Sequence, residues 1–249
     1  MDNKKKELWI GFFINMLGVI LAIALTFGVN SLWMRNEYRK RTKEMLILVR
    51  NELKDNKDNF KRQEQFLQNN GSVYKIILEA KKDMASIPPD SLKAYHTQIG
   101  DLRGTTLTTS AWQIFQNSEM IQKMTNKELL IRLTECYSLM EMLMDFILKD
   151  YWDVKKKMLT TLDLDDPSRF FDAVLKNNEY VYFFNLFSLD NNDMWLNFIT
   201  LDAMIDYTVM LMDKHGDYRY DMAEKDEELS SFIKERIESE FQQRENYEN

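Results

Sequence analysis

The stretch from Leu8 to Val29 constrains this chain more than any other part of its sequence. It reads LWIGFFINMLGVILAIALTFGV and contains no charged residue. As an α-helix this stretch would be about 33 Å long, enough to cross a hydrocarbon core of about 30 Å. The sequence therefore predicts a transmembrane helix over residues 8–30, preceded by a basic tail over residues 1–7.

A cleaved signal peptide is the alternative interpretation of this stretch. Lys4, Lys5 and Lys6 would form its basic start, and Thr26 and Gly28 are small residues of the kind that precede a cleavage site. The apolar part of a signal peptide has about 7 to 15 residues, and the run here is longer. It also continues without turn residues into a charged helical pattern, so a membrane anchor is favoured.

Small and polar residues recur along one face of the predicted span. Gly11, Asn15, Gly18, Ala22 and Thr26 follow one another at spacings of four, three, four and four. Small residues let helix backbones approach closely in lipid, and a side-chain amide there needs a polar partner. We expect this face to pack against a second copy or a protein partner. The alternative is that Gly is simply common in membrane helices and that Asn15 bonds its own backbone.

Basic residues follow the span directly. Arg35, Arg39, Lys40, Arg41 and Lys43 lie where a juxtamembrane helix would meet lipid head groups, and Arg50 is about two turns further on. Counting these charges against the three Lys of the tail favours a cytoplasmic C-terminal domain. Long domains also cross membranes largely regardless of charge, so the opposite orientation stays open.

The rest of the chain predicts an all-α fold. It contains only 7 Gly and 3 Pro in 249 residues, and its apolar residues recur at helical spacing. Residues 31–70 predict a long amphipathic juxtamembrane helix in which Leu46, Val49, Leu53, Phe60 and Leu67 share a seven-residue repeat with Asn56 and Gln63. A coiled-coil stalk would use such a repeat, but the first helix of a bundle is favoured because Ile47 and Leu48 widen the apolar face. Asn69 to Ser72 should end this helix.

Residues 71–249 predict a helical domain. Thr125 to Glu128 form a capping box that should start one long helix running to about Leu162. Asp166 and Pro167 should start another helix. The apolar run from Tyr180 to Phe187 fits a buried strand or a buried helix, and helix is favoured because no strand pattern surrounds it. Residues 100–110 should form a loop that ends at Ser110, the expected N-cap of the next helix.

No arrangement of side chains specifies a reaction. His96 and His215 are the only histidines, and Cys136 is the only cysteine, so neither a metal site nor a disulfide framework is expected. We predict no enzymatic activity and no cofactor. Residues 221–249 hold ten acidic and four basic residues, which argues against a nucleic-acid partner.

Two segments resemble a family of uncharacterised single-span bacterial membrane proteins of unknown function. In the first, the matching residues are Ala24, Leu25, Asn30, Trp33, Arg39, Lys40, Glu52 and Leu53. The second lies between Thr109 and Tyr137 and is carried by Trp112, Asn117, Leu129 and Tyr137. The resemblance implies a bacterial inner-membrane location and a helical domain, and it supplies no catalytic residues.

Together these features predict a membrane-anchored helical interaction or scaffold module that self-associates through its span. The alternative is a ligand-sensing helical domain that belongs to a membrane signalling assembly. Because only seven residues precede the span, such a sensor would need a separate effector.

Overall fold

The computed structural model describes residues 3–124, 126–162, 165–214, 230–239 and 242. These residues are predominantly helical and contain no strand, so the predicted all-α class is confirmed for them. The elements, in chain order, are α1 (Asn3–Glu79), η1 (Ala80–Lys82), η2 (Met84–Ser86), α2 (Pro89–Gly100), α3 (Ser110–Gln116), α4 (Glu119–Lys123), α5 (Lys127–Met142), η3 (Leu143–Leu148), α6 (Lys149–Thr161), α7 (Pro167–Lys176), α8 (Asn178–Phe187) and α9 (Asn192–Lys214).

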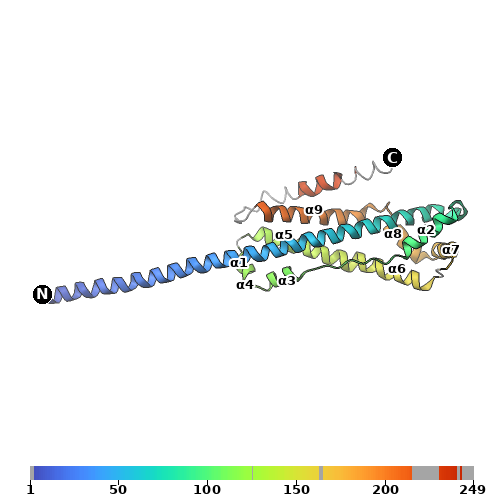
Figure 1. Cartoon of the computed structure of the whole chain (residues 1–249). Coiled ribbons are helices and arrows are strands. Elements are labelled where there is room, and N and C mark those ends of the chain that lie inside the picture. Colours follow the sequence, from blue (N-terminus) through green and yellow to red (C-terminus); the bar gives the residue numbers. More distant parts are fainter. Residues whose placement is uncertain (1–2, 125, 163–164, 215–229, 240–241, 243–249) are drawn as a thin grey trace.

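Helix α1 dominates the architecture. Its 77 residues form one unbroken helix whose first part projects alone and whose second part lies among the other helices (Figure 1). In the same view α9 lies on one side of α1 and α6 on the other. Helix α1 contacts α3, α8 and α9 directly, and α9 also contacts α5.

The expected helix end at Asn69 to Ser72 is wrong, because α1 continues through these residues to Glu79. The glycine serves close packing here. A Cβ on Gly71 would lie 2.6 Å from the backbone oxygen of Phe187 and 3.3 Å from the backbone nitrogen of Leu189. The segment after α8 can therefore reach the α1 backbone only where the side chain is missing. Asn70 and Ser72 bond the carbonyl oxygens one turn earlier, which keeps them within the helix.

The seven-residue repeat of α1 faces the core of its own chain. The repeat extends further than the sequence suggested, and all of its members are buried: Leu46, Val49, Leu53, Asn56, Phe60, Gln63, Leu67, Asn70, Tyr74 and Ile77. Its neighbours are helices of the same chain. This supports the interpretation of α1 as the first helix of the helical domain, and not as a separate coiled-coil stalk.

One long helical rod crosses the domain beside α1. As predicted it extends from residue 127 to 161, and its middle part, η3, is π-helical. Its N-cap is Asn126, whose side-chain oxygen accepts from the Leu129 amide. The N-cap therefore lies one residue after the predicted Thr125, which is outside the described residues, and because Leu129 occupies the third helical position the predicted capping box is wrong.

The remaining local predictions are mostly confirmed. Asp166 caps α7 by accepting from the amides of Ser168 and Arg169. The apolar run from Tyr180 to Phe187 is helical. Residues 101–109 have no regular structure, as expected of this loop, although its first residue, Gly100, still belongs to α2.

Candidate functional site

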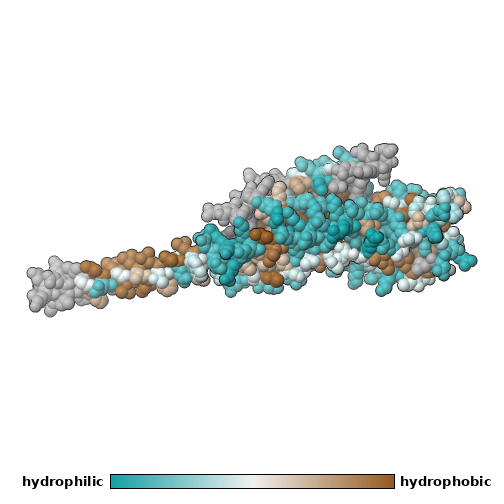
Figure 2. Space-filling model, viewed as in Figure 1, coloured by the Kyte–Doolittle hydropathy of each residue, from teal (hydrophilic) through white to brown (hydrophobic). Residues whose placement is uncertain are grey.

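The projecting part of α1 carries the small-residue face predicted from the sequence. Every side chain from Gly11 to Asn36 is exposed, and residues 11–34 form an apolar rod beside a largely hydrophilic body (Figure 2). A helix from Gly11 onward is long and apolar enough to cross a membrane by length and composition, a property that a signal sequence shares. A Cβ added to Gly11 or Gly18 would meet no atom within 4 Å.

Two polar groups on this face differ in their bonding. The Thr26 hydroxyl donates to the Ala22 carbonyl oxygen at 2.7 Å, so its donor is satisfied inside the helix. The structure records no hydrogen bond between the Asn15 amide and another described residue. The Asn15 amide is therefore the group on this face that a partner could hydrogen-bond.

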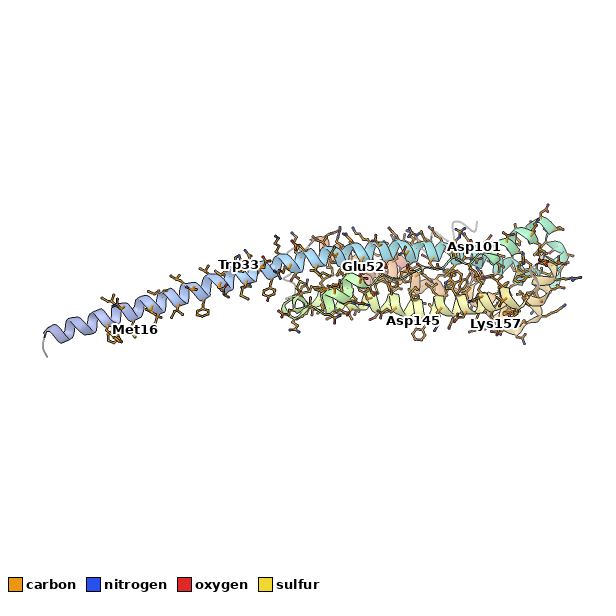
Figure 3. All side chains as sticks on the ribbon, turned by 60° about the horizontal axis from the view of Figure 1, so that its bottom comes forward. Met16, Trp33, Glu52, Asp101, Asp145 and Lys157 are labelled. Atoms are coloured by element: carbon orange, nitrogen blue, oxygen red, sulfur yellow. The ribbon has the colours of Figure 1, made fainter. Side chains whose placement is uncertain are left out.

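The predicted membrane-surface residues form a basic collar, made of Arg35, Arg39, Lys40, Arg41 and Lys43. All five side chains are exposed, and they surround α1 between the apolar rod and Met45, the first buried residue. Two of them pair within the helix, Arg41 with Glu37 at 3.0 Å and Lys40 with Glu44 at 4.0 Å. Figure 3 shows the order along α1, with Met16 and Trp33 on the free part and Glu52 where the body has begun.

A buried carboxylate joins three elements at this end of the domain. Glu52 accepts from the backbone amides of Ala111 and Trp112, at 2.7 and 3.1 Å, and from the Tyr137 hydroxyl at 2.6 Å. It therefore caps α3, whose own N-cap residue, Thr109, makes no side-chain cap bond. The expected cap at Ser110 is wrong, because Ser110 is the first residue of the helix.

This Glu52 cluster brings together residues from both segments that carry the family resemblance. The Trp112 and Tyr137 rings stack with centroids 5.0 Å apart and planes 4° apart. One turn along α1, Asn56 exchanges two hydrogen bonds with the backbone of Thr108. The cluster fixes the loop before α3 onto α1, which is a structural role.

A second polar cluster, centred on Lys155 of α6, lies further from the projecting rod. The Lys155 side chain is fully buried, and its Nζ donates to the Asp101 carbonyl oxygen at 2.7 Å and to the Tyr151 hydroxyl at 3.3 Å. Nζ also lies 4.8 Å from the centroid of the Phe66 ring, a cation–π distance. Phe66 in turn stacks on Trp152.

Burial shifts the pKa values of the ionisable groups in this cluster. Desolvation disfavours the ammonium form and lowers the pKa of Lys155 to about 7, against a smaller opposing effect of the Asp101 carboxylate. The Tyr151 hydroxyl is 3.0 Å from the Tyr74 hydroxyl, and burial raises the pKa of both phenols. Lys155 is therefore a lysine poised to change charge near neutral pH.

A cleft of about 430 Å³ opens beside this cluster, and we call it the distal cleft. It lies between α1, α2 and the start of the loop that follows α2. It shares Phe66 and Asp101 with the surroundings of Lys155. The lining residues are Phe66, Asn69, Asn70, Ser72, Val73, Ile76, Tyr95, Gln98, Asp101 and Arg103.

Sequence reasoning missed the Lys155 cluster and the distal cleft. Lys155 follows Tyr151 by one turn, on the apolar face of α6, and this position is a signal that could have identified a buried lysine. The cleft has no such signal, because its residues come from segments far apart in the sequence.

The residues considered for chemistry occupy ordinary packing positions. Cys136 is buried and contacts the Thr208 hydroxyl at 3.3 Å, and burial raises its pKa to about 12, which makes it a poor nucleophile. His96 packs edge-on against Phe170, and burial lowers its pKa. His215 lies outside the described residues. Among the described side chains no cluster of three or more His, Cys, Asp or Glu could hold a metal ion.

Compared with known proteins, the chain matches no family model, no curated protein and no solved structure.

Proposed function

We propose that this protein is a membrane-anchored helical interaction module without enzymatic activity, which self-associates through its span. One observation carries the proposal. A single helix exposes its apolar side chains from residues 11 to 34 and then, without a break, forms part of the core from Met45 onward. Exposing so much apolar surface to water is unfavourable, and a lipid bilayer would cover it.

The proposal assigns a role to each predicted surface residue. Gly11, Asn15, Gly18, Ala22 and Thr26 form the face that meets a second copy, and the basic collar meets anionic lipid head groups. Membership of the resembled family would place the anchor in the bacterial inner membrane. The charge count favours the cytoplasmic side for the domain.

Substituting Ile at both Gly18 and Ala22 tests self-association in a membrane reporter assay. A Cβ on Gly18 meets nothing in its own chain, so a weaker signal would report contacts between chains. Gly28→Ile is the matched control, because Gly28 has equally open surroundings and lies off the small-residue face. An unchanged signal in the double variant would leave the span as an anchor only.

The second candidate is the ligand-sensing domain of a signalling assembly with a separate effector. The distal cleft favours it, since it joins the loop after α2 to α1, the helix that continues into the apolar rod. Ligand binding there would act on the same helix that meets the membrane.

A further inference from the structure

We propose that the distal cleft binds a small zwitterion with an apolar side chain, of the α-amino-acid class. This proposal goes beyond the interaction function above and does not depend on self-association of the span. It rests on an unpaired acceptor, a pair of opposite charges at the cleft and an apolar wall.

The acceptor belongs to Asn70. This residue is fully buried and lines the cleft, and its Nδ2 donates to the Phe66 carbonyl oxygen at 2.9 Å. That bond fixes the orientation of the amide and leaves Oδ1 as its only acceptor. Oδ1 has no hydrogen-bond partner among the described residues. A buried acceptor left unpaired destabilises a fold. A ligand that donates an N–H group to Oδ1 would remove that penalty.

The charged pair consists of Asp101 and Arg103. Their carboxylate and guanidinium are 2.7 Å apart, in a loop without regular structure, and the Arg103 side chain is 76% exposed. An exposed pair of this kind contributes little to stability, so a ligand can separate it at little cost. An ammonium group would then meet Asp101 and a carboxylate would meet Arg103, whose planar guanidinium suits two parallel hydrogen bonds.

The apolar wall is formed by Phe66, Val73 and Ile76 of α1 and by Tyr95 of α2. It suits the side chain of a leucine-like or phenylalanine-like ligand, and the cleft volume lies within the range of about 300–1,000 Å³ typical of ligand pockets. An anion alone would face Asp101 and a cation alone would face Arg103. A zwitterion pairs with both charges, so we prefer it to a simple anion or a simple cation.

Calorimetric titration of the full chain in detergent micelles tests the proposal, with L-leucine and L-phenylalanine as probes. We expect saturable binding of both. Arg103→Ala should weaken it at least about tenfold, the loss that corresponds to about 1.4 kcal/mol. 3-Phenylpropanoate and phenethylamine, which lack the ammonium and the carboxylate respectively, should bind at least about tenfold more weakly than L-phenylalanine.

Two further variants separate binding from folding. Asn70→Leu removes the unpaired acceptor, so it should preserve or raise the melting temperature while binding is lost. Arg169→Ala is the matched control, because Arg169 is 78% exposed and pairs with nearby Asp166 outside the cleft; its affinity should equal that of the native chain.

Absence of binding by both amino acids would overturn the proposal, and so would full affinity in Arg103→Ala. Affinity for 3-phenylpropanoate equal to that for L-phenylalanine would overturn the zwitterion assignment. None of these results bears on the reporter assay for the span, so the two proposals fail separately.

Discussion

Replacing Glu52 by Gln should destabilise the domain although the side chain keeps its shape. The Glu52 carboxylate accepts from two backbone amides and the Tyr137 hydroxyl, and an amide group would turn one of these acceptors into a donor. Because hydrogen bonds to charged groups contribute about 1.5–3 kcal/mol, we expect a loss of about 2–3 kcal/mol in the free energy of unfolding, measured by urea denaturation.

Glu44→Gln is the control for this variant. Glu44 lies on the same helix with a 63% exposed side chain, and its partner Lys40 is 4.0 Å away. Its replacement should change the free energy of unfolding by less than about 0.5 kcal/mol. Equal losses in the two variants would contradict the capping role of Glu52.

Burial of Lys155 predicts that the stability of the fold depends on pH. Its pKa is about 7 in the folded protein and about 10.4 in an unfolded chain, so above pH 7 the unfolded state binds more protons. Stability should therefore rise with pH in this window. Relative to Lys155→Met, the free energy of unfolding of the native chain should increase by about 2 kcal/mol between about pH 7 and pH 9.

Parallel urea titrations of the two proteins at both pH values measure this difference. Methionine cannot titrate, so other groups cancel in the comparison. A constant difference across the window would mean that Lys155 keeps its ordinary pKa in the folded protein.

At the scale of elements, Gly71→Ala tests why α1 passes through a sequence that resembles a helix end. Alanine favours helix over glycine by about 1 kcal/mol. The added Cβ would lie 2.6 Å from a backbone oxygen, and overpacking of this kind costs about 1–3 kcal/mol. We expect a net destabilisation of up to about 2 kcal/mol, seen as a lower melting temperature.

Gly100→Ala is the matched substitution at the end of α2, where a Cβ would meet nothing within 4 Å. It should be neutral or slightly stabilising. A Gly71→Ala protein as stable as this control would show that the backbone near Phe187 can move away from the added Cβ without loss of stability.

Periodicity and capping predicted most elements of this fold, because both are local properties of a helix. They located the buried face of α1, the rod from residue 127 to 161 and the Asp166 cap. The prediction failed at Asn69 to Ser72, where local signals of a helix end compete with a tertiary contact that only glycine permits. The Glu52 cluster and the distal cleft were also missed, because each joins residues 29 to 85 positions apart.

At the scale of the whole molecule, the proposed orientation predicts the behaviour of C-terminal fusions. If the basic residues from Arg35 to Arg50 set the topology, alkaline phosphatase fused after Asn249 should be inactive and a fluorescent protein should be bright. Replacing Arg39, Lys40 and Arg41 by Gln should weaken this preference. Active phosphatase and a dark fluorescent protein would place the domain outside and contradict the charge argument.

Because α1 is unbroken, it also fixes how far the distal cleft lies from the membrane. If Trp33 lies at the bilayer surface, the 37 residues from there to Asn70 hold the distal cleft about 55 Å away, at about 1.5 Å per residue. A partner embedded in the same membrane can then touch the basic collar and α4, which meets Tyr38 through Glu119, but it cannot reach the cleft. Only diffusible molecules, or proteins with an equally long reach, come within contact of that end.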